Sequence, residues 1–252
     1  MEFLKAFNSR EGVYLLNEVD THFEDHYLAI RQKENRVYTD EEVKLLPAIN
    51  ASHHQYQEWQ IRKKSAERVV SFLNKKAILN VLDLGCGNGW FTKLLTRVDQ
   101  RDVLGLDINL LELKQAARLS IDNRCKFAYG DIFTADLPKA HFDVVTINSA
   151  IQYFPRVDLL IERLFELLKP LGEVHVLDSP IYHPNDVEAA KARSRLYYEE
   201  MQISGYDYHH HSWDAFEKFN YEKLYQPDQL ISRIGRKIFK NDSPFPWLKI
   251  VR

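Results

Sequence analysis

Three of the nine glycines in this 252-residue chain stand close together, at Gly85, Gly87 and Gly89. The run Asp83-Leu84-Gly85-Cys86-Gly87-Asn88-Gly89 follows an apolar stretch and precedes apolar residues at helical spacing. Glycines between a buried strand and a helix permit a tight turn and let a ligand approach the backbone closely. Free N–H groups at the start of the next helix add hydrogen-bond donors. The run therefore predicts a ligand-binding loop.

The spacing of this loop discriminates between nucleotide-like ligands. The pyrophosphate of a dinucleotide is typically bound by G-x-G-x-x-G, but here the spacing is G-x-G-x-G, and Trp90 stands where that pattern needs its last glycine. Asp83, at the start of the loop, would repel a pyrophosphate. The loop therefore favours a ligand with a cationic end and disfavours an NAD-dependent oxidoreductase.

Two further acids end the next two predicted strands. Asp107 closes Leu104-Gly105-Leu106-Asp107, and a carboxylate at this place has two oxygens able to accept hydrogen bonds. Asp131 follows in Gly130-Asp131-Ile132-Phe133. The structural alternative for both acids is capping, of a helix that begins near Leu110 and of a turn, and capping is compatible with ligand binding.

These segments together resemble the class I S-adenosylmethionine-dependent methyltransferases, in particular the small-molecule enzymes of the ubiquinone/menaquinone type (methyltransferase type 11). The stretch Val81–Gly89 matches the first motif of that family closely, and the resemblance covers roughly residues 52–178. It implies S-adenosylmethionine as cofactor, S-adenosylhomocysteine as product, and in-line transfer of the methyl group to a small-molecule acceptor.

The resemblance also implies roles for single residues. Asp107 would bind the ribose, Asp131 would accept from the adenine amino group, and the backbone at Ile132 would reach a ring nitrogen. Backbone carbonyls at Asn148 and Ser149 would suit the amino group of the cofactor. The predicted cofactor-binding residues are Asp83, Gly85, Cys86, Gly87, Asn88, Gly89, Asp107, Ile108, Asp131, Ile132, Asn148, Ser149 and Tyr56. Plain packing remains the alternative for Tyr56, and Cys86 is interpreted as a small packed residue rather than a nucleophile.

The sequence assigns no catalytic residue, because methyl transfer from a sulfonium needs a base only where the acceptor must lose a proton. The candidates are His183, Tyr153 and His210. Seven of the 13 tyrosines lie after the fifth strand, and residues 184–226 are predicted to form a lid over the acceptor pocket, with ordinary packing as the alternative. No metal site is expected, because no H-x-x-x-H or C-x-x-C spacing accompanies the histidines.

The elements that must position these residues alternate between short apolar runs and helical patterns, which is typical of a parallel sheet. We expect an α/β fold of the Rossmann-like, doubly wound type. It has a mostly parallel seven-stranded sheet, an N-terminal helical extension (1–50), a methyltransferase domain (51–252), a helical and aromatic insertion after the fifth strand, and a C-terminal antiparallel hairpin. The predicted strands are 78–84, 103–107, 126–130, 142–148, 173–178, 237–240 and 248–251, and the predicted helices before the loop are 21–32, 40–46 and 52–73.

The amino-acid composition limits the kinds of partner that the protein is expected to bind. With 34 Lys and Arg against 36 Asp and Glu, the net charge of −2 gives no general reason to bind nucleic acid or an acidic membrane. Two cysteines form no disulfide framework. The chain has no run of about 20 apolar residues and no signal peptide at its start. We expect a soluble, cytoplasmic protein with no nucleic-acid or membrane partner, and the oligomeric state is left open.

Two alternatives stay open. One is a methyltransferase acting on RNA or another macromolecule, although the fourth strand ends in Asn148-Ser149-Ala150-Ile151 rather than in the Asn/Asp-Pro-Pro-aromatic run of adenine amino-methylation. The other is a non-catalytic protein that binds S-adenosylmethionine. The identity of the acceptor, and whether oxygen, nitrogen or carbon receives the methyl group, are left open.

Overall fold

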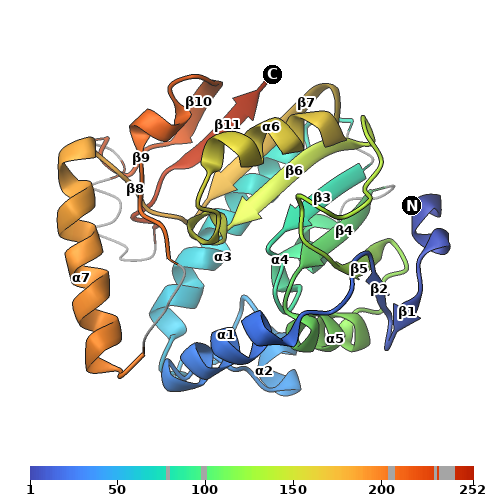
Figure 1. The fold of residues 1–252 in the computed structure, drawn as a ribbon, viewed down its shortest axis with the longest axis horizontal. Helices are drawn as coiled ribbons and strands as arrows, with labels where there is room; N and C mark the ends of the chain where they lie inside the picture. The colour runs from blue at the N-terminus through green and yellow to red at the C-terminus, as the bar shows by residue number, and fades with distance from the viewer. Residues whose placement is uncertain (78–79, 98–100, 204–207, 230–231, 233–241) are drawn as a thin grey trace.

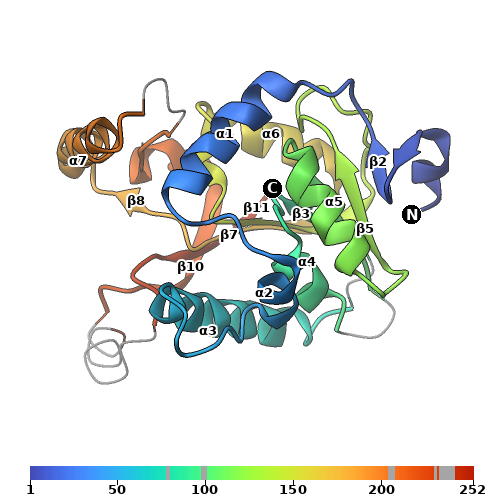
Figure 2. The ribbon, with the colours of Figure 1, turned by 90° about the horizontal axis from the view of Figure 1, so that it is seen from below.

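The computed structural model describes the chain except for residues 78–79, 98–100, 204–207, 230–231 and 233–241, and for residues 21–23, 25 and 26 it describes the backbone alone. Its centre is a nine-stranded sheet with the strand order β1-β2-β5-β4-β3-β6-β7-β11-β10 (Figure 1). Helices cover both faces of this sheet, with α3 and α6 on opposite sides (Figure 2). The architecture confirms the expected doubly wound α/β class.

Five parallel strands form the middle of the sheet, close to where the sequence predicts them. They are β3 (Asn80–Leu84), β4 (Asp102–Asp107), β5 (Cys125–Tyr129), β6 (Phe142–Asn148) and β7 (Leu168–Leu177). The chain runs outward from β3 through β4 and β5 and then returns to the other side of β3 with β6. Ligands of open α/β sheets bind at the carboxyl ends of the strands at such a reversal.

The antiparallel end of the sheet is built by β10 (Asn220–Tyr225) and β11 (Trp247–Val251), with β11 between β7 and β10. The predicted second strand of the hairpin is thus confirmed. The strand expected at 237–240 lies outside the described residues, and the partner of β11 is instead Asn220–Tyr225. This strand falls within the range expected for the lid, so the insertion ends before residue 220 rather than at 226.

The N-terminal region joins the sheet instead of lying only beside it. β2 (Val13–Leu15) pairs in parallel with β5, and β1 (Ser9–Arg10) pairs with β2, so that two strands not expected from the sequence join the described part of the sheet. Val13 is fully buried, and so is Leu4 in the short helix η1 (Glu2–Ala6). Burial of these apolar side chains against β5 explains why the segment is ordered there.

The helices before the glycine loop lie close to where the sequence predicts them. Alternation along β3 directs Val81 toward α3 and α4, and Leu82 and Leu84 toward α6, because successive side chains of a strand face opposite sides. No helix in the described part of the chain has the length and apolar character needed to cross a bilayer. The helices are α1 (Thr21–Lys33), α2 (Asp40–Leu45), α3 (Tyr56–Leu73), α4 (Trp90–Leu95), α5 (Leu110–Leu119) and α6 (Val157–Leu167).

The insertion after β7 contains one long helix, α7 (Val187–Glu200), which stands at the edge of the molecule in both views (Figures 1 and 2). Lys33, at the end of α1, donates from Nζ to the backbone oxygens of Met201 and Gln202, 2.8 and 3.1 Å away. The N-terminal helix and the insertion are therefore in contact. The other elements here are β8 (Ile181–Tyr182), η3 (Pro184–Asp186), β9 (His211–Ser212) and η4 (Trp213–Phe216).

The left-handed backbone at Gly89 leads to a stability prediction. Gly89 has φ +72°, and a Cβ built there would lie 2.6 Å from the Phe127 ring, so Gly89→Ala adds a ring clash to the backbone strain. We expect a loss of about 2–4 kcal/mol in the free energy of unfolding, measured by urea denaturation. Gly12→Ala is the matched control, because φ is +83° there but the nearest atom to the new Cβ is an Ala117 methyl at 3.2 Å. Equal losses in the two variants would contradict the ring clash.

Candidate functional site

The glycine loop connects the end of β3 to the start of α4, at the reversal of strand order. Gly85, Gly87 and Gly89 all have positive φ, between 50° and 72°, a conformation that L side chains rarely adopt. The N–H of Gly85 donates to the carbonyl of Leu106 at 2.8 Å, which holds the loop against β4. A Cβ at Gly85 would clash with that of Ala150, so the loop also packs against the segment after β6.

Asp83 lies beneath this loop and not on its open side. Its side chain is 1% exposed, and its two carboxylate oxygens accept hydrogen bonds from the hydroxyls of Thr92 on α4 (2.6 Å) and Thr146 on β6 (2.8 Å). Burial raises the pKa of Asp83 to about 6. The carboxylate thus joins α4 to β6 under the loop, and the structure does not bring it to the loop surface, where the sequence argument placed it.

Asp107 lies beside the loop at the end of β4. Its Oδ2 accepts from the N–H of Gly87 at 2.8 Å, and its Oδ1 accepts from the N–H of Asn109 at 2.9 Å. Burial raises its pKa, and these backbone donors oppose that rise. Each oxygen keeps a lone pair beyond the bond that it already accepts. Ile108 follows it and is partly exposed.

Glu112 is a further acid at this place that the sequence argument did not single out. A Cβ at Gly87 would lie 3.1 Å from its Oε2, so the carboxyl group lies over the loop. Burial raises the pKa of Glu112 to about 7, and the negative charge of Asp107 adds to this. The pattern Asn109-x-x-Glu112 carries a signal for it, because Asn109 caps α5 by accepting from the N–H of Glu112.

Asp131 stands one strand further along. It follows β5, and the pairing of Asp107 with Tyr129 brings the two acids to the same edge of the sheet. Asp131 is exposed and accepts from the N–H of Phe133 at 2.9 Å, which is the turn cap expected as its structural alternative. Ile132 is 2% exposed and packs in the core.

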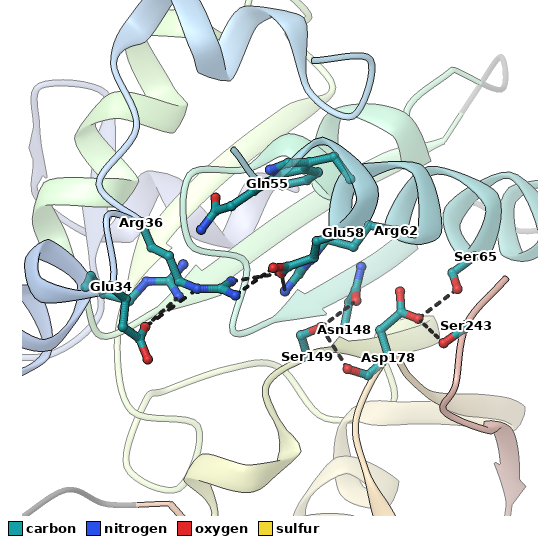
Figure 3. Close-up of polar contacts among 12 residues, drawn as sticks. Glu34, Arg36, Gln55, Glu58, Arg62, Ser65, Asn148, Ser149, Asp178 and Ser243 are labelled. Carbon is teal, nitrogen blue, oxygen red and sulfur yellow. Dashed lines mark hydrogen bonds and ion pairs between the residues drawn. The ribbon is translucent and has the colours of Figure 1, made fainter. Parts of the chain in front are cut away.

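The ends of β6 and β7 carry a second group of polar side chains (Figure 3). Ser149 and Asp178 both have positive φ, and the Ser149 hydroxyl donates to the backbone oxygen of Asp178 at 2.9 Å. Asp178 Oδ1 accepts from Ser65 at 2.7 Å and from Ser243 at 2.9 Å. Asp178 Oδ2 and Asn148 Nδ2 are buried and have no hydrogen-bond partner among the described residues.

The first turns of α3 face the same region (Figure 3). Arg36 donates twice to Glu58, at 2.8 and 2.6 Å, and Arg62 donates to the same carboxylate at 2.9 Å. Tyr56, the first residue of α3, is partly buried and packs against the core cluster of α3 and α4. The structure therefore agrees with plain packing of Tyr56, and a contact between Tyr56 and a ligand stays a prediction.

The other loop residues are held by packing. Cys86 is buried, and its sulfur lies 2.8 Å from where a Cβ at Gly105 would stand. Burial raises its pKa well above the usual value of a thiol, which opposes a nucleophilic role. The Asn88 side chain is buried and accepts from the N–H of Trp90 at 3.3 Å.

The three candidate bases occupy different surroundings. Tyr153 in η2 (Ile151–Tyr153) makes edge contacts with Tyr27 and Tyr208, at ring distances of 6.0 and 6.3 Å. His210 lies 5.0 Å from the Tyr208 ring, its Nε2 lies 2.9 Å from Ser194 Oγ, and burial lowers its pKa. His183 is exposed at the start of the insertion. Tyr153 and His210 are thus joined through Tyr208, whereas His183 stands apart.

No metal set accompanies these residues in the part of the chain that the structure describes, where no three His, Cys, Asp or Glu side chains come together to hold an ion.

Comparison with known proteins gives one family and several relatives. The profile of a family described as "Methyltransferase domain" matches residues 75–225. Trans-aconitate 2-methyltransferase of Deinococcus radiodurans is 33% identical over 132 residues, 52% of this chain and 48% of its own length. Malonyl-[acyl-carrier protein] O-methyltransferase of Calditerrivibrio nitroreducens is 32% identical over 116 residues, 44% of each chain. The chain thus spans about half the length of the curated relatives it matches.

Solved structures share the fold at low sequence identity. Magnesium protoporphyrin IX methyltransferase from Synechocystis, crystallised with S-adenosylhomocysteine, has a TM-score of 0.59 at 17% identity, over 92% of this chain and 99% of its own. Geranyl diphosphate C-methyltransferase from Streptomyces coelicolor has a TM-score of 0.54 at 15% identity, over 80% of this chain and 84% of its own.

The raised pKa of Asp83 makes a pH-dependent prediction for Asp83→Asn. The folded protein keeps the Asp83 proton up to pH about 6, whereas an unfolded chain releases it near pH 4. The wild type therefore loses on the order of 2–3 kcal/mol of stability between about pH 4 and 6 through this group. The uncharged variant lacks that loss, so its stability relative to wild type should rise by this amount from pH 4 to 7.

Urea denaturation at several pH values measures this difference. The exposed Asp136→Asn is the control for loss of a carboxylate, and we expect its difference from wild type to change little over the same range. A difference between Asp83→Asn and wild type that does not vary with pH would contradict the assignment.

Proposed function

Because the chain belongs to the methyltransferase-domain family whose profile spans residues 75–225, we propose that it transfers a methyl group from S-adenosylmethionine to a small-molecule acceptor. The observation that carries the proposal is the glycine loop at the reversal of strand order, with the Asp107 carboxylate bonded to the N–H of Gly87 beside it. The relatives support the reaction, since both curated proteins are named as methyltransferases of small or carrier-bound molecules.

The residues present fit S-adenosylmethionine at this edge. The left-handed glycines give the loop a backbone course that L side chains rarely adopt, and each Asp107 oxygen beside it has a lone pair available for a ribose hydroxyl. Asp131 and the backbone at Ile132 would hold the adenine, and backbone atoms at Gly85, Asn148 and Ser149 would hold the amino acid part. The amide nitrogen of Asn148, which has no hydrogen-bond partner within the described part of the chain, is a further donor there.

The remaining predicted residues take narrower roles in this proposal. Asp83 acts as a positioning residue, because its oxygens are bonded to Thr92 and Thr146 beneath the loop. Cys86 and Asn88 contribute the backbone of the loop, and Tyr56 and Ile108 border the site. Glu112 joins the set, because its carboxyl group lies over Gly87.

Methyl transfer from the sulfonium is an in-line displacement that requires positioning and exclusion of water more than acid or base chemistry. The acceptor pocket would lie between α1, η2 and the insertion of residues 184–219, with Tyr153 and His210 as the candidate bases if the acceptor must lose a proton. The proposed location is the cytoplasm, which two unpaired, buried cysteines suit.

Asp107→Asn tests the cofactor site. Charged hydrogen bonds contribute on the order of 1.5–3 kcal/mol each, so we expect the Kd for S-adenosylhomocysteine, measured by calorimetry, to rise at least about tenfold. Asp102→Asn, at the other end of the same strand, is the matched control and should leave the Kd unchanged. An unchanged Kd in Asp107→Asn would exclude the ribose role, and binding of NAD in place of S-adenosylhomocysteine would exclude the cofactor.

A label-transfer experiment tests the acceptor class. The protein is incubated with methyl-labelled S-adenosylmethionine and, separately, with a filtered metabolite extract, total RNA, DNA and extracted protein. We expect label in the metabolite fraction. Label in RNA, DNA or protein would instead indicate macromolecule methylation. Cofactor binding without transfer to any of the four would indicate a non-catalytic binding protein.

A further inference from the structure

One cation lies between the cofactor side of the site and the tyrosines of the insertion. Arg31 on α1 is largely buried, with 20% of its side chain exposed, and the Tyr27 ring lies 5.6 Å from its Cζ. On one side α1 reaches the start of α5, because Glu24 accepts from the N–H of Leu111 at 2.5 Å. On the other side the Tyr27 ring contacts the Tyr153 ring, with the centroids 6.0 Å apart. Arg31 therefore lies on a helix that borders both the first turn of α5 and the candidate base Tyr153.

The guanidinium of Arg31 is poorly paired. Its only ion pair in the described part of the chain is with Glu34, whose Oε2 lies 3.7 Å from Nη1, well beyond the 2.7–2.9 Å of a charge-assisted hydrogen bond. Its Nε is buried and has no hydrogen-bond partner among the described residues. A buried charge that lacks hydrogen bonds is unfavourable, so this edge of the guanidinium is suited to receive an anion.

The nearby acids Glu34 and Glu112 do not supply the hydrogen bond that Arg31 Nε lacks. Glu34 is shared, because it also lies 3.7 Å from Nε of Arg36 (Figure 3). It further accepts from the Tyr197 hydroxyl at 3.3 Å. Glu112, with its pKa raised to about 7, is only partly ionised at neutral pH. Neither acid lies within hydrogen-bond distance of Arg31 Nε.

The surrounding side chains suit a small organic ion better than bulk water. Tyr27 and Tyr208 each make an edge contact with Tyr153, and desolvation raises the pKa of all three phenols, so they are uncharged at neutral pH. Tyr198 adds a fourth such ring from α7. The Tyr27 ring beside the guanidinium, with Tyr153 and Tyr208 in contact beyond it, offers the flat apolar surface that suits a flat or partly apolar acid.

We propose that Arg31 binds the carboxylate of an acidic small-molecule acceptor through its Nε–Nη2 edge, and so determines the acceptor class. Arginine is suited to this because its planar fork matches the two oxygens of a carboxylate. The inference rests on the proposed methyl transfer and goes beyond it, because it states what the acceptor carries. It assigns Arg31 to substrate binding and leaves the methylated atom unspecified.

A direct test follows the Arg31 Nε–H signal by nuclear magnetic resonance in ¹⁵N-arginine protein saturated with S-adenosylhomocysteine, with Arg31→Lys used to assign the signal. Acetate is the probe, and acetamide is the neutral control at equal ionic strength. We expect a saturable shift with acetate and none with acetamide. The carboxylate assignment would be overturned by the absence of a shift with acetate or by equal shifts with acetate and acetamide. A shift with inorganic phosphate but not with acetate would also overturn it.

The cofactor also carries a carboxylate, so a second experiment distinguishes binding of the cofactor carboxylate from binding of the acceptor carboxylate. The same signal is followed while S-adenosylhomocysteine is added to the free protein. If the cofactor product itself shifts Arg31 and abolishes the response to acetate, Arg31 binds the cofactor and the acceptor assignment is wrong. If S-adenosylhomocysteine does not bind at all, the proposed function fails, whatever acetate does.

Variants give the functional test. A metabolite extract is divided on an anion exchanger, and label should pass to molecules that the resin retains. Arg31→Met should lower kcat/KM for that fraction at least tenfold while the Kd for S-adenosylhomocysteine stays within twofold, and Arg31→Lys should restore part of the loss. Arg10→Met, on exposed β1, is the matched control for lost charge. Label in unretained molecules, or full activity in Arg31→Met, would overturn the proposal.

Discussion

The carboxylate of Asp83 is the junction on which the candidate site depends. It is almost completely buried, and it holds α4 and β6 together from beneath the glycine loop through two threonine hydroxyls. The two elements that flank the loop are therefore fixed relative to each other before any ligand arrives. Burial of this carboxylate opposes its ionisation, so the protein places an unfavourable group where rigidity matters most.

Much of the central sheet and of its loop edge follows from local sequence. The strands β3, β4 and β6 are mainly apolar and buried, and the glycines and Asp107 lie where such strands end. Those signals need only a few neighbouring residues. This is why the fold class, the family and the position of the loop could be predicted.

The edges of the sheet could not be predicted in the same way. β2 has three residues, and β10 alternates weakly between exposed and partly buried positions, because an edge strand has a neighbour on one side only. Arg31 and Glu112 were also missed. An arginine on a helix and a glutamate in a first turn are typical of solvated faces, and their surroundings depend on segments far away in sequence, such as the glycine loop that faces Glu112.

The pairing of β2 with β5 has a consequence for how the molecule is assembled. Val13 lies opposite Phe127 and Leu15 opposite Tyr129, so more than a hundred residues separate the two strands in the chain. Contacts of such high sequence separation form slowly. During synthesis β2 is made before β5 and stays unpaired until β5 follows. Until the two strands pair, the outer edge of β5 is exposed and can pair with strands of other chains. We expect the order of events on the ribosome, rather than the final contacts alone, to decide how much of this protein reaches its native state.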